Sequence, residues 1–264
     1  MNDLLKQAVR QSLKSLGIGI TSRRRLLELE EKSRTRDLFA LILELPRRHK
    51  EQLLNFLPHS RSQLGQDLFV LSELEFKRDG FFVEFGAIDG LYLSNSYLLE
   101  KDFGWRGIVA EAAPGWHKDL RRNRSCHVET DCVWIESNAT LTFTQTNDWG
   151  LSTIDAFHSS DGYSKQRMNG KKYEVGTISL TDMLEKYNAP RMIDYLSIDT
   201  EGSEFDILSH FHFDKHQFRV ITCEHNFTPQ REKIFDLLTG KGYIRKFQDI
   251  SNVDDWYVRA EPEK

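Results

Sequence analysis

Carboxylates and a histidine gather after two apolar stretches in the second half of the chain. Three carboxylates lie within residues 199–204, and Glu224 and His225 follow the next apolar run. Carboxylate oxygens suit Mg²⁺ or Mn²⁺, and a histidine with a pKa near neutrality suits a general base. We therefore predict Asp199, Glu201 and His225 as catalytic residues, and Asp199 and Glu224 as metal ligands. For His225, the catalytic and the structural interpretations both stay open.

A glycine-containing turn follows the apolar run 81–85. Gly86 and Gly90 let the backbone turn tightly and approach a ligand. The dinucleotide-binding fingerprint needs three glycines in the order G-x-G-x-x-G. Ile88 and Leu91 stand at its second and third glycine positions. This departure argues against a nicotinamide or flavin site.

Two carboxylates beside this turn favour a ligand with positive charge. Glu84 and Asp89 would repel a pyrophosphate, whereas they attract the sulfonium and ammonium groups of S-adenosylmethionine (SAM). The carboxylate of SAM is expected at the N-terminus of the next helix, near Asn95.

Further polar residues follow the second and third expected strands. Glu111 comes about twenty residues beyond the glycine turn, a position from which an acid accepts hydrogen bonds from both ribose hydroxyls. Asp131 or Cys132 is expected near the adenine edge. For Asp131, the cofactor role and an ordinary surface role both stay open.

The elements that must position these residues alternate from residue 61 onward. The expected strands cover 81–85, 107–110, 127–133, 140–146, 193–198, 220–223 and 256–259, and the expected helices cover 94–103, 116–122, 181–187 and 231–238. This alternation predicts a mostly parallel sheet with helices on both faces, which binds ligands at the carboxyl ends of its strands. Thr181 is expected to cap its helix, and Glu204 to support the helix that it precedes.

The stretch 149–175 is long and polar for a connection between strands. Long loops over a site are often lids or acceptor-binding elements. Trp149, Tyr163 and Tyr173 either stack on a sugar ring or pack in the core.

Residues 1–60 differ from the rest in charge and pattern. They carry a balance of +5, against −9 for residues 61–264. Apolar spacing predicts helices over 4–16, 22–45 and 49–57, so we predict a helical N-terminal extension. It packs on the main domain or on a second copy in a homo-oligomer. The less favoured interpretation is a basic amphipathic anchor at a membrane surface.

The composition excludes several classes of protein. A net charge of −4 argues against a general nucleic-acid binder. Three cysteines without metal-ligand spacing predict free thiols in a reducing compartment. No apolar run is long enough to span a membrane, and no signal-peptide core is present. These features predict a cytoplasmic protein.

Taken in order, the motifs resemble the FkbM family of SAM-dependent methyltransferases. The segments that carry the resemblance are 62–67 (SQLGQD), 82–90 (FVEFGAIDG), 94–96 (SNS), 104–107 (GWRG), Glu111 and 198–204 (IDTEGSE). The resemblance implies a Rossmann-like class I methyltransferase fold over residues 61–264, with a mostly parallel seven-stranded sheet. It also implies SAM as the cofactor and methylation of an oxygen on a small-molecule or glycan acceptor, such as a sugar hydroxyl.

Matching positions assign cofactor contacts. The assigned residues are Glu84, Gly86, Asp89, Gly90, Asn95 and Glu111, with Gln63 and Asp67 closing over the cofactor from the preceding segment. Ala112 departs from the family pattern, in which a Pro or Asn often follows the acid, so the local loop shape is open. Two other functions remain: a SAM-binding scaffold without activity, recruited through its helical N-terminus, and a nucleotide-binding oxidoreductase, which the broken glycine pattern disfavours.

Overall fold

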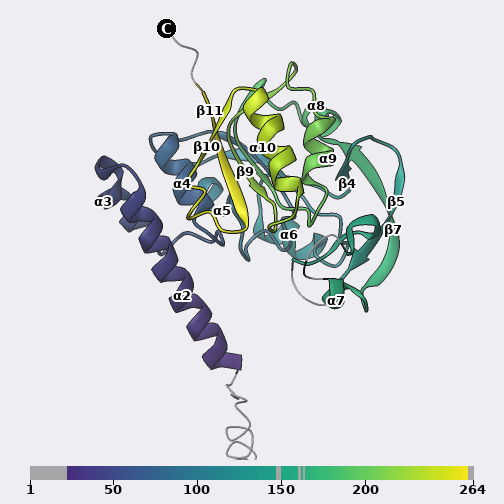
Figure 1. The fold of residues 1–264 in the computed structure, drawn as a ribbon, viewed down its shortest axis with the longest axis horizontal. Helices are drawn as coiled ribbons and strands as arrows, with labels where there is room; N and C mark the ends of the chain where they lie inside the picture. Colours follow the sequence, from purple (N-terminus) through teal and green to yellow (C-terminus); the bar gives the residue numbers. More distant parts are fainter. Residues whose placement is uncertain (1–22, 147–149, 160–161, 163, 261–264) are drawn as a thin grey trace, which may run out of the picture.

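The computed structural model describes residues 23–146, 150–159, 162 and 164–260, with side chains from residue 33 onward (Figure 1). The helix predicted over residues 4–16 lies outside these ranges, as do Trp149 and Tyr163. Within them, the structure forms two sheets, and helices cover both faces of the larger one.

The larger sheet has seven strands in the described residues. Its order is β10-β11-β9-β8-β1-β2-β3, and β11 runs antiparallel to both of its neighbours while the remaining pairs are parallel. The strands are β1 (Phe81–Phe85), β2 (Arg106–Ala110), β3 (His127–Glu129), β8 (Met192–Ile198), β9 (Gln217–Glu224), β10 (Tyr243–Lys246) and β11 (Asp254–Arg259). The predicted Rossmann-like class I methyltransferase fold is confirmed. Chain order reverses at β1, the topological switch point where such sheets bind ligands.

Alternation along the strands divides the core into two layers. In β1, Val83 and Phe85 join one hydrophobic cluster and Phe82 joins the other, because successive side chains point to opposite faces. The first cluster includes side chains of α8 (Leu180–Lys186), α9 (Glu204–Ser209) and α10 (Gln230–Gly240). The second includes those of α4 (Gln66–Glu73), α5 (Tyr97–Phe103) and α6 (His117–Asn123).

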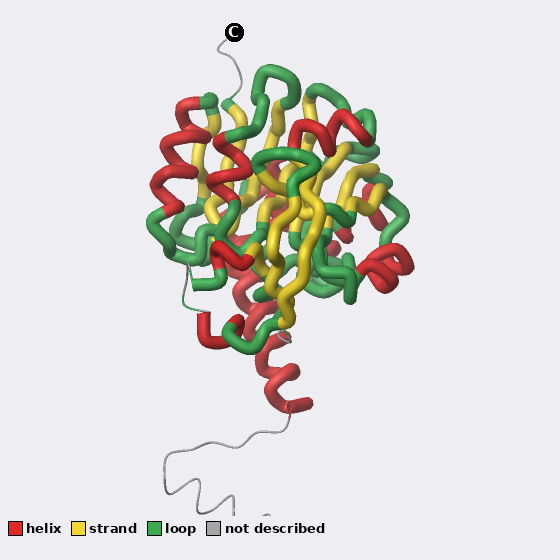
Figure 2. The backbone as a smooth tube through the Cα atoms, turned by 90° about the vertical axis from the view of Figure 1, so that its right-hand side faces the viewer, coloured by secondary structure: helices red, strands yellow, loops and turns green. Residues whose placement is uncertain are grey.

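A second sheet of four strands lies beside the first. Its order is β4-β7-β5-β6, and in Figure 2 its two longest strands face the viewer. The elements of this region are β4 (Cys132–Trp134), β5 (Thr140–Gln145), β6 (Thr153–Ile154), the 3₁₀ turn η1 (Asp155–Phe157), α7 (Ser164–Arg167) and β7 (Lys171–Ser179).

Two sequence predictions are wrong in this part of the chain. The single strand expected over 127–133 is divided, because Glu129 accepts hydrogen bonds from the backbone of residues 130–131, and the chain turns there from β3 into β4. Helix α8 is capped by Ser179, whose hydroxyl accepts from the backbone N–H of Asp182, and not by Thr181.

The N-terminal helices match their predicted ranges. Helices α2 (Arg23–Glu44) and α3 (Arg47–Phe56) precede the sheet, and α2 extends away from the domain (Figure 1). Leu41, Leu45 and Leu53 are buried in the same cluster as α4 and α5, so the end of α2 and α3 pack on the main domain. None of the described helices has the length and apolar character needed to cross a bilayer.

Candidate cofactor and acceptor site

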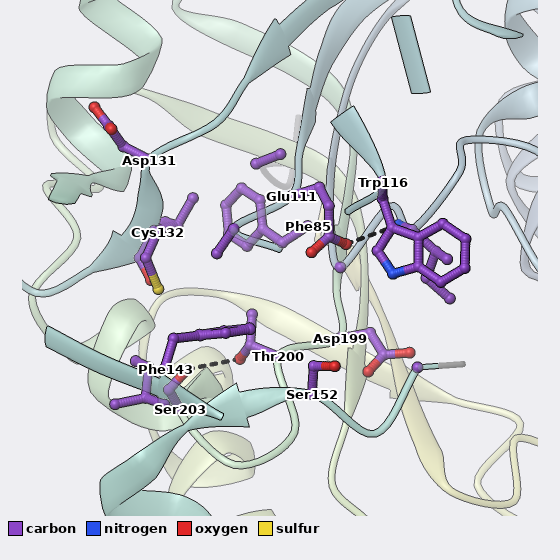
Figure 3. A pocket seen from close by; sticks show the side chains of 17 residues that line it. Phe85, Glu111, Trp116, Asp131, Cys132, Phe143, Ser152, Asp199, Thr200 and Ser203 are labelled. Carbon is purple, nitrogen blue, oxygen red and sulfur yellow. Dashed lines mark hydrogen bonds between the residues drawn. The ribbon is translucent and has the colours of Figure 1, made fainter. Parts of the chain in front are cut away.

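A cavity opens where the carboxyl ends of β1, β2 and β8 meet. It holds about 670 Å³ of space, including open solvent at its mouth. Phe85, Glu111, Asp131, Cys132 and Asp199 are among its lining residues (Figure 3). The cavity therefore occupies the edge of the sheet at which the sequence placed the cofactor.

Glu111 directly follows β2 and is nearly buried, with 7% of its surface exposed. Its Oε2 accepts a hydrogen bond from the backbone N–H of Ile88 at 2.9 Å, and its Oε1 accepts one from Ala113 at 2.8 Å. Burial raises the pKa of Glu111 to about 7. Each oxygen has a second lone pair, so the carboxylate has room to accept two ribose hydroxyls.

The pH dependence of SAM binding tests this role. Hydroxyls that bind the carboxylate must lower its pKa in the complex, so binding releases a proton and affinity rises with pH through about 7. Calorimetry at about pH 6 and pH 8 is expected to show affinity several-fold stronger at the higher value. In Glu111→Gln, SAM affinity is expected to fall, and its dependence on pH is expected to flatten.

His117 provides the control, because it is another titratable side chain in contact with Glu111. Its Nε2 lies 2.8 Å from the Glu111 carbonyl oxygen, and burial lowers its pKa. His117→Gln is expected to keep the pH dependence of SAM binding. Retention of the full dependence in Glu111→Gln would contradict the assignment.

Gly86 ends β1 in a conformation that requires glycine. Its φ is +68°, and a Cβ atom there would lie 2.1 Å from the carbonyl oxygen of Asp199. The turn after β1 therefore passes against the turn after β8 with no space for a side chain. Gly90, with φ +75°, faces Leu120 and Arg124 of the α6 region and does not line either cavity.

A second cavity, of about 750 Å³ including its mouth, continues from the first and shares Gly86 and Asp199 with it. Gln63, Glu84 and Asn95, which the sequence assigns to the cofactor, line it. Three carboxylates, Asp199, Glu201 and Glu224, also line it, with one oxygen from each within 4.8 Å of the others. The structure thus brings together residues that follow two adjacent parallel strands, β8 and β9.

Two buried oxygens at this second cavity have no partner among the described residues. They are Oε2 of Glu224 and Oδ1 of Asn95, on side chains that are 7% and 8% exposed. A buried polar atom without a partner costs free energy. Such atoms at a cavity wall are consistent with a polar or cationic ligand.

The three carboxylates differ in their surroundings. Burial raises the pKa of Asp199 to about 7, with the nearby Asp254 adding to the effect. Burial and the Asp199 charge raise the pKa of Glu224 well above its usual range. Glu201 instead pairs with the buried Arg167 of α7, at 2.7 Å. Within this cluster, Asp199 and Glu224 therefore have no positive partner among the described residues.

Glu204 supports the loop after β8, as expected for a residue at the start of α9. Its Oε1 accepts from the backbone and hydroxyl of Thr200, both at 2.9 Å, and from the backbone of Gly202. Thr153 of β6 donates to the carbonyl of Glu201 at 3.0 Å. The loop that carries Asp199 and Glu201 is thus fixed from both sides.

Glu84 is held by an arginine that the sequence analysis missed. Arg124 follows α6, and its fully buried guanidinium lies 3.3 Å from Glu84 Oε2 and 2.5 Å from Glu100 Oε2. Glu84 also accepts from the hydroxyls of Ser94 and Ser96 and from the backbone of Asn95. This network fixes the segment before α5, and no spacing along the chain indicates it.

Besides Gly90, two further predicted cofactor residues lie outside both cavities. Asp67 is fully buried and accepts from the hydroxyls of Ser60 and Ser62 at 2.8 and 2.6 Å. Oδ1 of Asp89 accepts from the backbone N–H groups of residues 91–92. Both therefore shape the loops that carry the site, and the structure does not place them where they would touch the cofactor. Asp131 lines the first cavity at its far side from Glu111 (Figure 3).

His225 also lies outside both cavities. Its Nδ1 accepts from the backbone N–H of Phe227 at 3.0 Å, and its Nε2 lies 3.8 Å from Oδ1 of Asp255. Burial lowers its pKa. The ring is thus directed toward Asp255 and its own turn, and these contacts do not support a general base, so that role stays a prediction.

The solved structures that resemble this chain do so weakly. One is a precorrin-6y C5,15-methyltransferase from Geobacter metallireducens GS-15, with 12% identity, a TM-score of 0.37, and coverage of 70% of this chain and 73% of that one. Another is a TehB-like SAM-dependent methyltransferase from Corynebacterium glutamicum ATCC 13032 Kitasato, with 7% identity, a TM-score of 0.37, and coverage of 81% and 97%. Scores this low support no inference, and no curated protein matches the chain.

The family comparison is more decisive. The model of the methyltransferase FkbM domain matches residues 84–254, which is well over half of the chain. The match begins at the acid of the glycine turn and ends at the start of β11, so it contains both turns that form the two cavities. The chain therefore belongs to the FkbM family of SAM-dependent methyltransferases.

Proposed function

We propose that this methyltransferase transfers the methyl group of SAM to a hydroxyl of a sugar, in a small-molecule or glycan acceptor. The observation that carries the proposal is the cluster of Asp199, Glu201 and Glu224 at a cavity that adjoins the Gly86 turn. Methyl transfer to an alcohol requires that a proton be removed, and a carboxylate cluster beside the donor provides acceptors for it.

The chain's own residues fit SAM in both cavities. Bound SAM supplies a methyl group that is already activated on a sulfonium. Glu111 accepts hydrogen bonds from the ribose hydroxyls, and the backbone of Gly86 forms part of the wall of both cavities. Oδ1 of Asn95, buried and without a described partner, is suited to accept from the ammonium group.

The acidic cluster prepares the acceptor for an in-line displacement. A cluster carboxylate accepts the hydrogen bond of the acceptor hydroxyl and takes its proton as the oxygen bonds to the methyl carbon. The carbon–sulfur bond breaks, and its electron pair stays on sulfur. Asp199 is suited to this position because it lines both cavities.

The same residues also fit a divalent cation. Asp199 and Glu224 would hold Mg²⁺ or Mn²⁺, and the partnerless Oε2 of Glu224 is the kind of oxygen that such an ion binds. A cation there would lower the pKa of the acceptor hydroxyl. Glu201 is less suited as a ligand because Arg167 already neutralises it.

Asp199→Asn tests both parts of this proposal, because it keeps the shape of the side chain and removes its charge. We expect turnover on neutral methyl glycosides, followed with labelled SAM, to fall by at least about 100-fold. Mn²⁺ binding, followed by calorimetry on the protein without SAM, is expected to be lost, while SAM affinity stays within about threefold of the wild type.

A matched control is Asp206→Asn, on the outward side of α9 and outside both cavities. It is expected to leave turnover and Mn²⁺ binding unchanged. Wild-type protein that binds SAM and methylates no hydroxyl would contradict the proposed reaction. Full turnover in Asp199→Asn would remove Asp199 from the mechanism.

A further inference from the structure

One exposed aromatic side chain lines the second cavity, which the three carboxylates make acidic, and another directly follows a residue that lines it. Tyr92 lines it and is 47% exposed, and Phe227 directly follows the lining residue Asn226 and is 66% exposed. Most of the large apolar side chains in the described part of the chain are buried. Exposed aromatic groups beside a polar cavity indicate a surface that binds something.

Phe227 is held in this position by its backbone. Asn226 and Phe227 have φ values of +44° and +54°, which are costly for residues with a side chain and above all for a bulky one. The backbone N–H of Asn226 donates to the carbonyl of Val253 at 3.2 Å, and that of Thr228 donates to the carbonyl of His225 at 2.8 Å. The turn after β9 thus keeps an aromatic ring exposed to solvent in a backbone conformation that is energetically unfavourable.

His225 completes this turn with its side chain. Its Nδ1 accepts the backbone N–H of Phe227 at 3.0 Å, and its ring meets the Phe227 ring edge-on, with centroids 5.2 Å apart. Through these contacts the buried imidazole supports the turn, and this role requires no proton transfer. They make it a positioning residue for Phe227.

The polar groups of the cavity restrict what these aromatic rings would bind. Asp199 and Glu224, which have no positive partner among the described residues, disfavour an anionic acceptor, and the carboxyl oxygens of the cluster accept hydrogen bonds from hydroxyls. The amides of Gln63 and Asn226 both donate and accept. A neutral sugar ring meets both requirements, because one face carries C–H groups that pack on an aromatic ring and its edge carries hydroxyls.

We propose that Phe227 and Tyr92 form an acceptor platform for a neutral sugar ring, which His225 holds in place through the backbone of Phe227. The platform rests on the proposed sugar methylation, since it adds the surface that orients the sugar over the acidic cluster. The platform also gives a role to His225, which lies outside both cavities and contacts Phe227 directly.

The test uses the full chain with S-adenosylhomocysteine and a panel of neutral glycosides, namely the methyl pyranosides of glucose, galactose, mannose and rhamnose. Saturation-transfer NMR measures their binding, and labelled SAM measures their methylation. Phe227→Ala is expected to raise the KM for the best glycoside by about tenfold, with kcat within about twofold. The conservative variant Phe227→Tyr is expected to keep KM near the wild-type value. Ile244→Ala is the matched control, because Ile244 is 54% exposed on β10 and lines neither cavity.

His225 is tested by the same measurements. His225→Ala is expected to raise KM as Phe227→Ala does, with the pH profile of kcat unchanged. His225→Asn, whose side-chain oxygen can accept from the backbone of Phe227, is expected to recover most of the loss. A fall in kcat of about 100-fold with an altered pH profile would instead show a general base and overturn the positioning role.

The outcomes separate this platform from the proposed reaction. Glycosides that are methylated with the same KM in Phe227→Ala and Tyr92→Ala would overturn the platform and leave the reaction standing. Glycosides that bind through Phe227 without being methylated would support the platform and overturn the reaction. If the protein preferred an amino sugar and methylated its nitrogen, the proposal that the acceptor is a neutral sugar would be overturned.

Discussion

The Gly86→Ala variant is expected to lose SAM affinity by at least about 100-fold, which corresponds to about 2.7 kcal/mol. A methyl group at this position would lie 2.1 Å from the carbonyl oxygen of Asp199, and the φ of +68° is unfavourable for alanine. The neighbouring atom belongs to the backbone, so no side-chain rotation relieves the clash. The turns after β1 and β8 must move apart, and both cavities include them.

Calorimetric titration with SAM measures this effect, with circular dichroism to establish that the variant remains folded. Gly240→Ala is the matched control, since no atom lies within 4 Å of a Cβ built at the end of α10. It is expected to bind SAM as the wild type does. Unchanged affinity in a folded Gly86→Ala protein would show that the cofactor does not lie against this turn.

The second large effect is expected from Arg124→Ala, which should lower the free energy of unfolding by about 3–5 kcal/mol. The substitution leaves Glu84 buried without its positive partner, and it leaves Glu100 with Lys101 alone. It also removes hydrogen bonds to the hydroxyls of Ser94 and Ser96. Because the segment before α5 carries Asn95, SAM affinity is expected to fall together with stability.

Urea denaturation at neutral pH measures the stability change. Arg122→Ala is the control, because Arg122 lies in α6, two residues before Arg124, and forms an exposed pair with Asp119 at 2.9 Å. Such surface pairs contribute about 0–1 kcal/mol. A loss below about 1 kcal/mol in Arg124→Ala would mean that water or another group satisfies the buried acids, and that this network does not hold the site.

The sequence by itself determined the fold and the location of the site. Runs such as 193–198, which is apolar apart from Asp194 and Ser197, became strands at nearly their predicted bounds, because a parallel sheet buries both faces of its strands. The acids that follow these runs had to gather at one edge, since the carboxyl ends of parallel strands lie together. Asp199, Glu201 and Glu224 were predicted for that reason and lie within 4.8 Å.

The short spacing of a glycine or an acid from the end of a strand also predicted which residues line the cavity. Gly86 and Glu111 act within a few residues of a strand end, so chain position alone places them at the first cavity. The single strand predicted over 127–133 was wrong, because the turn made by Glu129 divides it into β3 and β4. The polar run 129–131 is the feature of the sequence that marks this turn.

Only the tertiary structure decided which polar residues face the ligand and which support it. Asp67, Asp89 and His225 have types and positions suited to a site, yet each is directed into its own loop. Arg124 and Arg167 come from distant segments to meet Glu84 and Glu201 inside the protein. Strand position is a local property that the amino-acid pattern carries. The direction of a buried polar side chain depends on partners far along the chain, which only the folded molecule brings into contact.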